Sequence, residues 1–242
     1  MMKMNGNHWN GWGITQIGPA HIKSGIPNQD SFAIKKFKWG IVGVVCDGLG
    51  SKRYSHIGSK CLSNAIITAS RIFDFQTSNI ELFESLVKSI WKKNIYPYSE
   101  QDCATTLLFT IIRDNKVYIG RVGDGAISIL GDKNKLVEEN KESFTNYTTP
   151  FGREMEIQWQ TFDTKDVESI SLCSDGISED IQKDRLLDFF KSYVCKYKDQ
   201  KNRKRKKEIK AWLKNWPVKG HSDDKTIVAI VKMDNNEKNR SI

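Results

Sequence analysis

Residues 44–51 read VVCDGLGS, an apolar run that stops at an aspartate followed by a glycine. Residues 172–178, LCSDGIS, have the same form. Short apolar runs of this kind are typical of strands covered on both faces, where a carboxylate would be costly to bury. An aspartate at the point where such a strand ends can instead reach a cleft, and the glycine lets the backbone approach a ligand closely. The two stretches therefore predict strands that carry functional carboxylates at their ends.

The pattern around these stretches predicts strands that cluster and helices that come in pairs. Apolar runs predict strands at 13–18, 39–46, 104–112, 116–122, 126–130, 168–174 and 224–233. Apolar spacing of three and four predicts helices at 57–73, 82–91 and 183–193. This order favours a layered α/β architecture built on antiparallel sheets over a parallel βαβ sheet.

The middle of the chain contains two kinds of predicted connection, tight turns and one long surface segment. The runs between 104 and 130 read as antiparallel neighbours joined by tight turns, the second of them at Gly123-Asp124-Gly125. Residues 131–166 are polar and poorly patterned, which indicates a long surface excursion with a turn at 149–152.

Length and composition indicate one globular domain over residues 1–242, with flexible tails at 1–11 and 234–242. No stretch is apolar enough to span a membrane, and the N-terminus lacks the apolar core of a secretory signal, so we expect a cytoplasmic protein. Five cysteines without a C-x-x-C pair argue against a disulfide framework and a zinc knuckle. Four of them stand at apolar positions and are expected to be small buried side chains.

The net charge of +9 is concentrated in one segment. Residues 196–214 contain ten basic and two acidic residues, a net charge of +8. Apolar residues at 209, 212, 213 and 216 predict that the end of this segment packs as a helix. The basic run then reads as a solvated helix face; a patch for nucleic acid, an acidic substrate or a membrane surface is the alternative. It lacks the interleaved aromatic residues that stack on bases.

Four aspartates stand where an apolar strand ends or begins: Asp47, Asp124, Asp175 and Asp223. A single Asp-Gly pair is a common turn, and Asp124, between two glycines, is the most turn-like of the four. Several carboxylates that converge would repel one another unless cations lie between them. Oxygen ligands without paired Cys or His suit Mg²⁺, Mn²⁺ or Ca²⁺. The four aspartates therefore allow two interpretations: a shared metal site, or four separate turns.

Five blocks along the chain, in order, are similar to the motifs of one enzyme family. GPAHIKSGIPNQDSF (18–32) is similar to an opening motif with Asn-Glu-Asp or Asn-Gln-Asp, and VVCDGLGS to an Asp-Gly-His-Gly-Gly block. CATTLLFTII with VYIGRVGDGAISIL is similar to a Gly-(Ser/Cys)-Thr strand and a Gly-Asp-Ser block. SLCSDGISE and SDDKTIVAIV are similar to Ser-Asp-Gly-Leu-Trp and to a closing Asp-Asn-x-Thr strand. The chain thus resembles the metal-dependent Ser/Thr protein phosphatases of type 2C, in a divergent bacterial subgroup.

The resemblance implies both the fold and the reaction. The fold would be α/β (α+β) and layered, with two stacked antiparallel β-sheets flanked by pairs of α-helices. The reaction would be hydrolysis of phosphoserine or phosphothreonine in proteins by water activated by two Mn²⁺ or Mg²⁺ ions, with a third, weaker ion nearby. The partners would be a phosphorylated protein and its cognate kinase, and the protein would act as a monomer.

The resemblance also assigns roles to the aspartates. Asp47 would bridge two ions, and the carbonyl of Gly48 would complete the ligands of one of them. Asp175 and Asp223 would hold the other ion. Asp124 matches the position that in bacterial relatives helps Asp175 to hold the weaker third ion.

Other positions of the opening motifs match the family only in part. Asp30, with Gln29 where the family has Glu, would orient water. The arginine that grips phosphate in the family is Gly25 here, and the histidine expected to act as an acid is Leu49. His21 is the candidate for gripping phosphate or protonating the leaving group. These departures motivate a second hypothesis, a catalytically weak phosphatase-like module that binds a phosphoprotein or regulatory partner. A third hypothesis is association with nucleic acid through 196–214.

Overall fold

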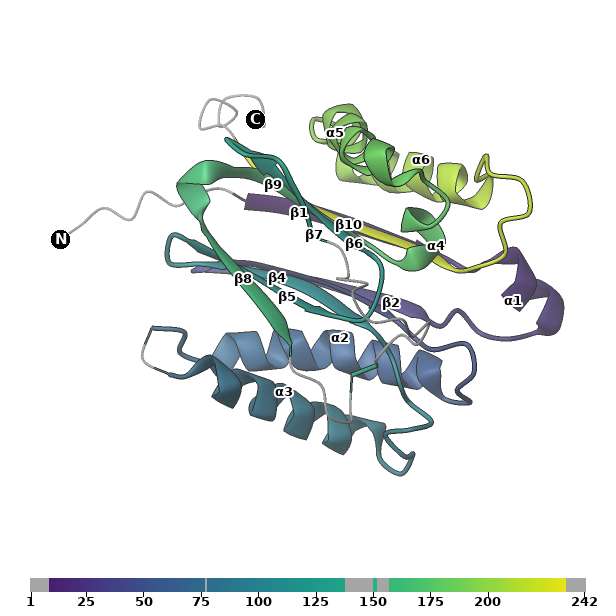
Figure 1. Cartoon of the computed structure of the whole chain (residues 1–242), viewed down its shortest axis with the longest axis horizontal. Coiled ribbons are helices and arrows are strands. Elements are labelled where there is room, and N and C mark those ends of the chain that lie inside the picture. Colours follow the sequence, from purple (N-terminus) through teal and green to yellow (C-terminus); the bar gives the residue numbers. More distant parts are fainter. Residues whose placement is uncertain (1–8, 77, 138–149, 152–156, 234–242) are drawn as a thin grey trace.

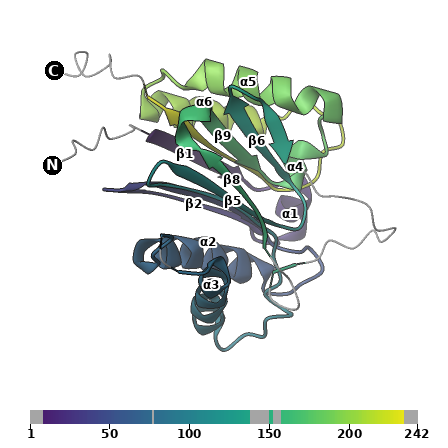
Figure 2. The same ribbon diagram turned by 60° about the vertical axis from the view of Figure 1, so that its left-hand side comes forward.

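Two antiparallel sheets lie face to face, and helices cover the outer face of each (Figure 1). The computed structural model describes residues 9–76, 78–137, 150–151 and 157–233. The order of layers is the same when the molecule is turned, with α5 and α6 on one side and α2 and α3 on the other (Figure 2). This architecture confirms the predicted fold class.

Each sheet has five strands. Sheet A has the order β1 (Trp9–Gln16), β10 (Lys225–Lys232), β9 (Val167–Cys173), β6 (Ala126–Gly131) and β7 (Lys135–Val137). Sheet B has the order β2 (Asp30–Phe37), β3 (Gly40–Asp47), β4 (Leu107–Arg113), β5 (Lys116–Val122) and β8 (Gln158–Asp163).

The helices fall into two outer pairs and several short pieces at strand ends. Sheet B is covered by α2 (Ser55–Ile72) and α3 (Ile80–Ile95), and sheet A by α5 (Leu186–Tyr197) and α6 (Asn202–Lys214) (Figure 1). The short helices are α1 (Pro19–Ser24), α4 (Asp175–Ser178), η1 (Thr164–Asp166) and η2 (Lys183–Arg185).

Strand β3 is apolar throughout because it is buried on both faces. Val42, Val44 and Cys46 pack into the cluster beneath α2 and α3. Ile41 and Val45 point the other way, into the cluster between the two sheets. The continuous run that precedes Asp47 is therefore required by two separate cores, and it confirms the prediction made from the sequence.

The α5–α6 layer has its own apolar cluster against sheet A, and the predicted packing of the end of α6 is confirmed. Ile209 and Leu213 are fully buried there. Arg205 is an exception to the solvated basic run: only 3% of it is exposed, and its guanidinium lies 4.2 Å from the centre of the Trp12 ring. Exposed cations at positions 203, 206, 207, 210 and 214 form a stripe along one side of α6, and Lys204 is exposed as well.

Three sequence predictions require correction. Gly123-Asp124-Gly125 does not close a hairpin, because β5 belongs to sheet B and β6 to sheet A; the segment is the crossover between the sheets. The excursion expected at 131–166 contains β7 and the edge strand β8, whose polar, half-exposed residues hide its pattern. The expected tail 1–11 is too long, because β1 begins at Trp9.

Other predictions fall partly or wholly outside the described residues. The turn expected at 149–152 is one of them, since 149 and 152 are not described; Phe151 itself bridges to Thr105. The tail at 234–242 is another. Among the described helices none is long and apolar enough to cross a bilayer. All five cysteines are free; Cys61 is half-buried and Cys195 exposed, so the expected burial holds for Cys46, Cys103 and Cys173.

Candidate active site

A cleft of about 380 Å³ opens at one end of the two sheets, where several strands end. Its lining gathers most of the residues singled out in the sequence. The lining residues are Ala20, His21, Gln29, Asp47, Gly48, Leu49, Gly50, Thr106, Asp124, Asp175, Ser222 and Asp223. Segments far apart in the chain therefore meet here, as the metal-site reading of the four aspartates required.

Asp47 is held at the end of β3 by the backbone and hydroxyls of two threonines. Its N–H donates to Thr106 Oγ1 (3.0 Å), and its carbonyl accepts from Thr106 N–H (2.7 Å) and from Thr105 Oγ1 (2.8 Å). The next residue must be glycine, because a Cβ at Gly48 would lie 2.7 Å from the carbonyl of Ser55 at the start of α2. These contacts fix the direction in which the Asp47 carboxylate leaves the sheet.

Asp30 lies directly behind Asp47, because the β2–β3 register places the two residues opposite each other. Asp30 is buried, and its Oδ2 accepts a hydrogen bond from Ser174 Oγ (2.7 Å). Ser174 also accepts from the N–H of Thr226 (3.0 Å) and so joins β2, the end of β9 and β10. The serine that precedes Asp175 thus ties the two sheets together at the cleft.

Asp175 and Asp223 come from adjacent strands of sheet A that approach closely at this end. A Cβ at Gly176 would collide with the carbonyl of Asp224 and would lie 3.3 Å from Cβ of Asp223. Glycine after Asp175 is therefore needed for the start of α4 to lie against the start of β10. This close approach brings the second and third predicted carboxylates into one cleft.

Asp124 enters the cleft from the crossover between the sheets. Both flanking glycines have positive φ, +84° at Gly123 and +86° at Gly125, a conformation that other residues rarely adopt. The buried Arg121 donates to the carbonyls of Val137 (2.9 Å) and Gly125 (3.4 Å). The crossover is thereby pinned on its interior side while Asp124 faces the cleft.

The carboxylates strongly perturb one another. Burial raises the pKa of Asp30 to about 8, aided by the charges of Asp224 and Asp175. Burial, with the charges of Asp30 and Asp175, holds the pKa of Asp47 well above its usual range. Burial raises the pKa of Asp175 to about 6, and the charges of Asp124 and Asp223 add to the effect. Each shift has the sign expected for carboxyl groups crowded together out of water.

The donor set fits divalent cations. Asp175 Oδ1 and Asp30 Oδ1 are buried and find no hydrogen-bond donor among the described residues. Unpaired buried carboxylate oxygens beside other carboxylates are costly unless a cation compensates them. Asp47, Asp124, Asp175 and Asp223 offer only oxygen atoms, the ligands that Mg²⁺ and Mn²⁺ accept.

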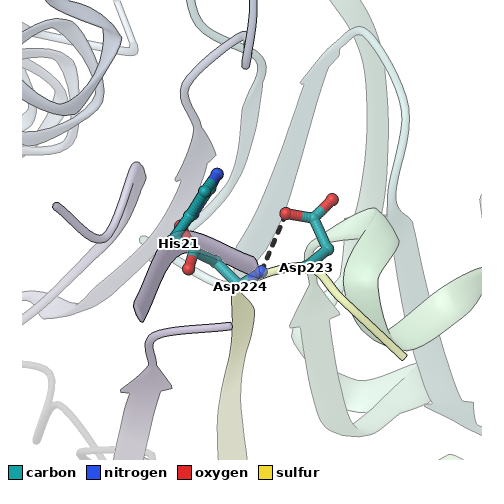
Figure 3. A group of neighbouring side chains, drawn as sticks. All are labelled: His21, Asp223 and Asp224. Atoms are coloured by element: carbon teal, nitrogen blue, oxygen red, sulfur yellow. Dashed lines mark hydrogen bonds and ion pairs between the residues drawn. The ribbon is translucent and has the colours of Figure 1, made fainter. Parts of the chain in front are cut away.

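His21 lies in the cleft on α1, is partly exposed, and contacts the buried Asp224. Its Nδ1 is 2.9 Å from Asp224 Oδ2. Figure 3 shows the imidazole of His21 and the carboxylate of Asp223 side by side at the start of β10. Gly25 lies at the far end of α1, in the left-handed region (φ +65°), and a Cβ there would meet nothing within 4 Å.

The cleft is poor in positive charge. Among the residues that the structure describes, its lining contains neither Lys nor Arg, and Leu49 occupies part of the wall. Lys23 and Arg53 are exposed and Lys52 is half-buried, but none of them lines the cleft. Of the described side chains that line the cleft, His21 alone is of a basic type.

Sequence reasoning missed the residues that hold the ligands in place: Asp224, Ser174 and Thr106. Asp224 is 1% exposed and accepts the N–H groups of Gly18 (2.7 Å) and Gln29 (2.6 Å). The signal in the sequence was the pair of adjacent acids at 223 and 224. Adjacent side chains on a strand point to opposite faces, so only one of the two acids can face the cleft. The other must then bind partners inside the protein.

The comparisons with known proteins agree with this geometry. A family model described as "Protein phosphatase 2C" matches residues 17–216; Asp223 lies just beyond the match. No curated protein matches the chain. Among solved structures, the serine/threonine phosphatase Stp1 from Staphylococcus aureus has a TM-score of 0.67 at 14% identity, covering 97% of this chain and 99% of that one.

Two further solved structures contain metal ions. The catalytic domain of the serine/threonine protein phosphatase PstP, in complex with two manganese ions, has a TM-score of 0.58 at 16% identity, covering 93% of this chain and 99% of that one. RsbX in complex with magnesium has a TM-score of 0.59 at 13% identity, covering 95% and 98%. At these identities the structural likeness shows the fold alone.

Proposed function

Because the chain belongs to the protein phosphatase 2C family, as its motifs predicted, we propose that it hydrolyses phosphoserine and phosphothreonine in proteins with Mn²⁺ or Mg²⁺ held in its cleft. The substrate would be a protein phosphorylated by a cognate Ser/Thr kinase. One observation carries the proposal: Asp47, Asp124, Asp175 and Asp223 reach one cleft from three different strand ends and the crossover. The metal-bound PstP and RsbX structures support the choice of ions.

The residues divide between ligands and supports. Asp47 and the Gly48 carbonyl would serve one ion, and Asp47, Asp175 and Asp223 the other, with Asp124 adding to a weaker third site. Bound cations supply charge neutralisation for the phosphoryl oxygens and acidify a water molecule. Threonines 105 and 106 hold the Asp47 backbone, so its carboxylate is aimed before any ion or substrate arrives.

Asp30 is suited to orient a water molecule. Its Oδ2 is committed to Ser174, whereas its buried Oδ1 has no donor among the described residues and can accept one. Burial raises its pKa to about 8 in the metal-free protein, so the carboxyl is protonated at neutral pH there; a cation bound nearby would favour the ionised form. The leaving-group oxygen would take its proton from solvent, since Leu49 stands where eukaryotic-type members carry histidine.

A second candidate function is phosphoprotein binding without turnover. The observation that favours it is the absence of Lys and Arg from the described part of the cleft lining, since a cation there would grip phosphate. Such a module would bind metal and a phosphopeptide but release no phosphate. The two candidates therefore differ in one measurable product.

The test is release of inorganic phosphate from a phosphothreonine peptide, with Mn²⁺, with Mg²⁺ and with a chelator. We expect metal-dependent release by the wild type and a loss of at least about a hundredfold for Asp47→Asn, which removes one charged ligand. Asp184→Asn is the matched control, because Asp184 lies on the exposed η2.

Phosphate release that survives chelation, or that Asp47→Asn leaves intact, would refute the metal-dependent reaction. Phosphopeptide binding by calorimetry with no phosphate release in any metal would establish the binding module instead. Phosphate release by the wild type excludes that module.

A further inference from the structure

Three side chains meet at the edge of the cleft: His21 from α1, and Asp223 and Asp224 from the start of β10. One ligand atom of each lies within 4.8 Å of the others. Figure 3 shows the imidazole and the Asp223 carboxylate on either side of Asp224, with the nitrogen at the far end of the ring pointing away from Asp224. The three side chains contact different residues, and these contacts indicate a different role for each.

Asp224 is fully committed to the protein. Its Oδ1 accepts the N–H of Gly18, and its Oδ2 accepts the N–H of Gln29 and lies 2.9 Å from Nδ1 of His21. This close contact turns the Nδ1 side of the ring toward Asp224, although Nδ1 makes no hydrogen bond of regular geometry with any described residue. Nε2 then lies on the other side of the ring, away from Asp224.

Asp223 is oriented by one backbone hydrogen bond and faces the cleft. Its Oδ1 accepts the N–H of Asp224 (2.8 Å), which orients the carboxylate at the cleft wall. His21 lines the same cleft. The two side chains therefore present a nitrogen and an oxygen donor to one space.

Helix α1 holds His21 in this position through its backbone. Ala20 N–H donates to the carbonyl of Ser222 (3.1 Å), and Gly18 N–H is bound by Asp224. A Cβ at Gly18 would lie 2.4 Å from the Asp223 backbone, so glycine is what allows the two segments to touch. The start of α1 is thus fastened to the start of β10 on both sides of Asp223.

We propose that His21 Nε2 is a ligand of the ion that Asp223 holds, and that Asp224 is its positioning carboxylate. The inference rests on the proposed function, since it concerns the same cations. A carboxylate on one ring nitrogen and a metal on the other is the usual arrangement of metal-binding histidines. It replaces the role in gripping phosphate, or protonating the leaving group, that the sequence suggested for His21.

A nitrogen ligand changes which metal the site prefers. Imidazole binds transition metals well, whereas Mg²⁺ strongly prefers oxygen ligands. The His21 site therefore favours Mn²⁺ over Mg²⁺ more strongly than an all-oxygen site would. This selectivity is a property of the chain that can be measured without any substrate.

The test is pulsed EPR of the Mn²⁺-loaded protein, where a coordinated imidazole gives a nitrogen coupling, together with calorimetric Mn²⁺ and Mg²⁺ titrations. We expect nitrogen coupling in the wild type, its loss in His21→Ala, and a fall of about 10–100-fold in Mn²⁺ affinity for one ion. Mg²⁺ affinity should be unchanged. His56→Ala is the matched control and should behave as the wild type, because His56 does not line the cleft.

The wild-type spectrum decides the question even if His21→Ala folds poorly. Absence of nitrogen coupling in the wild type would overturn the proposal and return His21 to a role with phosphate or the leaving group. Coupling that persists in a folded His21→Ala would overturn it as well. Because these readouts need no turnover, they can fail while metal-dependent phosphate release succeeds, and the reverse.

Discussion

Replacing Asp30 by asparagine should make the metal-free protein more stable, although Asp30 belongs to the functional site. Burial raises the pKa of Asp30 from 3.8 to about 8, so at pH 7 the carboxyl is protonated in the folded chain and ionised in the unfolded chain. Each pH unit between these values then costs about 1.4 kcal/mol of stability. At pH 7 the accumulated cost is about 4 kcal/mol.

The sign follows from the direction of the shift. A folded-state pKa above the unfolded value gives stability that is complete below about pH 4 and is lost as the pH rises toward 8. The raised pKa values of Asp47 and Asp175 act in the same direction. Asparagine keeps the shape and can still accept from Ser174 Oγ, but it cannot ionise. Asp30→Asn therefore removes one contribution to the dependence of the free energy of unfolding on pH.

The assay is urea unfolding in the presence of a chelator at pH 5, 6, 7 and 8. Between pH 5 and 7 the free energies of unfolding of the two proteins should diverge by about 1.4 kcal/mol per pH unit, and the variant should be the more stable at pH 8. Asp184→Asn, on exposed η2, should run parallel to the wild type. Parallel slopes for wild type and Asp30→Asn, or a variant that is less stable at every pH, would refute the reasoning.

Three further outcomes are expected. Asp124→Asn should abolish the weakest metal-binding step in a calorimetric titration and leave the tighter ones in place; loss of every step would show that Asp124 supports the whole centre. Gly58→Ala should cost about 1–3 kcal/mol in urea unfolding, because its methyl group would strike the carbonyl of Cys103 beside α2; an unchanged midpoint would contradict that close contact. Leu213→Ala, fully buried in the α5–α6 layer, should cost about 2–5 kcal/mol while leaving phosphate release by the folded protein unaltered.

Much of the fold could be read from the sequence because its strands serve two cores. A strand buried on both faces, such as β3, must be apolar at every position, and the first residue that is not apolar marks its end. The same property revealed Asp47 and Asp175. The edge strand β8 lies at the rim of sheet B and alternates poorly, so it left no such signal.

The errors came from features that local sequence cannot distinguish. Gly123-Asp124-Gly125 has the chemistry of a hairpin, and only the pairing of β5 and β6 with different partners shows that it crosses between sheets. The burial of Arg205 depends on the Trp12 ring, a partner almost 200 positions away in the chain. Likewise, Asp224 differs from Asp223 only in which backbone groups it meets.

The layer formed by η2, α5 and α6 divides the charge of the molecule unequally. Residues 183–219 contain fourteen basic and four acidic side chains, a net charge of +10, so the rest of the chain, with the whole at +9, has a net charge of −1. The layer lies on the outer face of sheet A, whereas the acidic cleft opens at the strand ends (Figure 1). The positive charge of the protein is therefore concentrated in one layer.

This concentration of charge in one layer affects how the molecule meets a charged surface. On an anionic support, whether an ion-exchange bead or a polyanion, the α5–α6 face should turn inward, because screening confines such attraction to about 10 Å at 0.1 M salt. The cleft, on another side, then stays open to solvent. A protein adsorbed in this way should still bind substrate in its cleft. The orientation of the protein on the support, rather than its affinity for the support, would then determine which substrates reach the cleft.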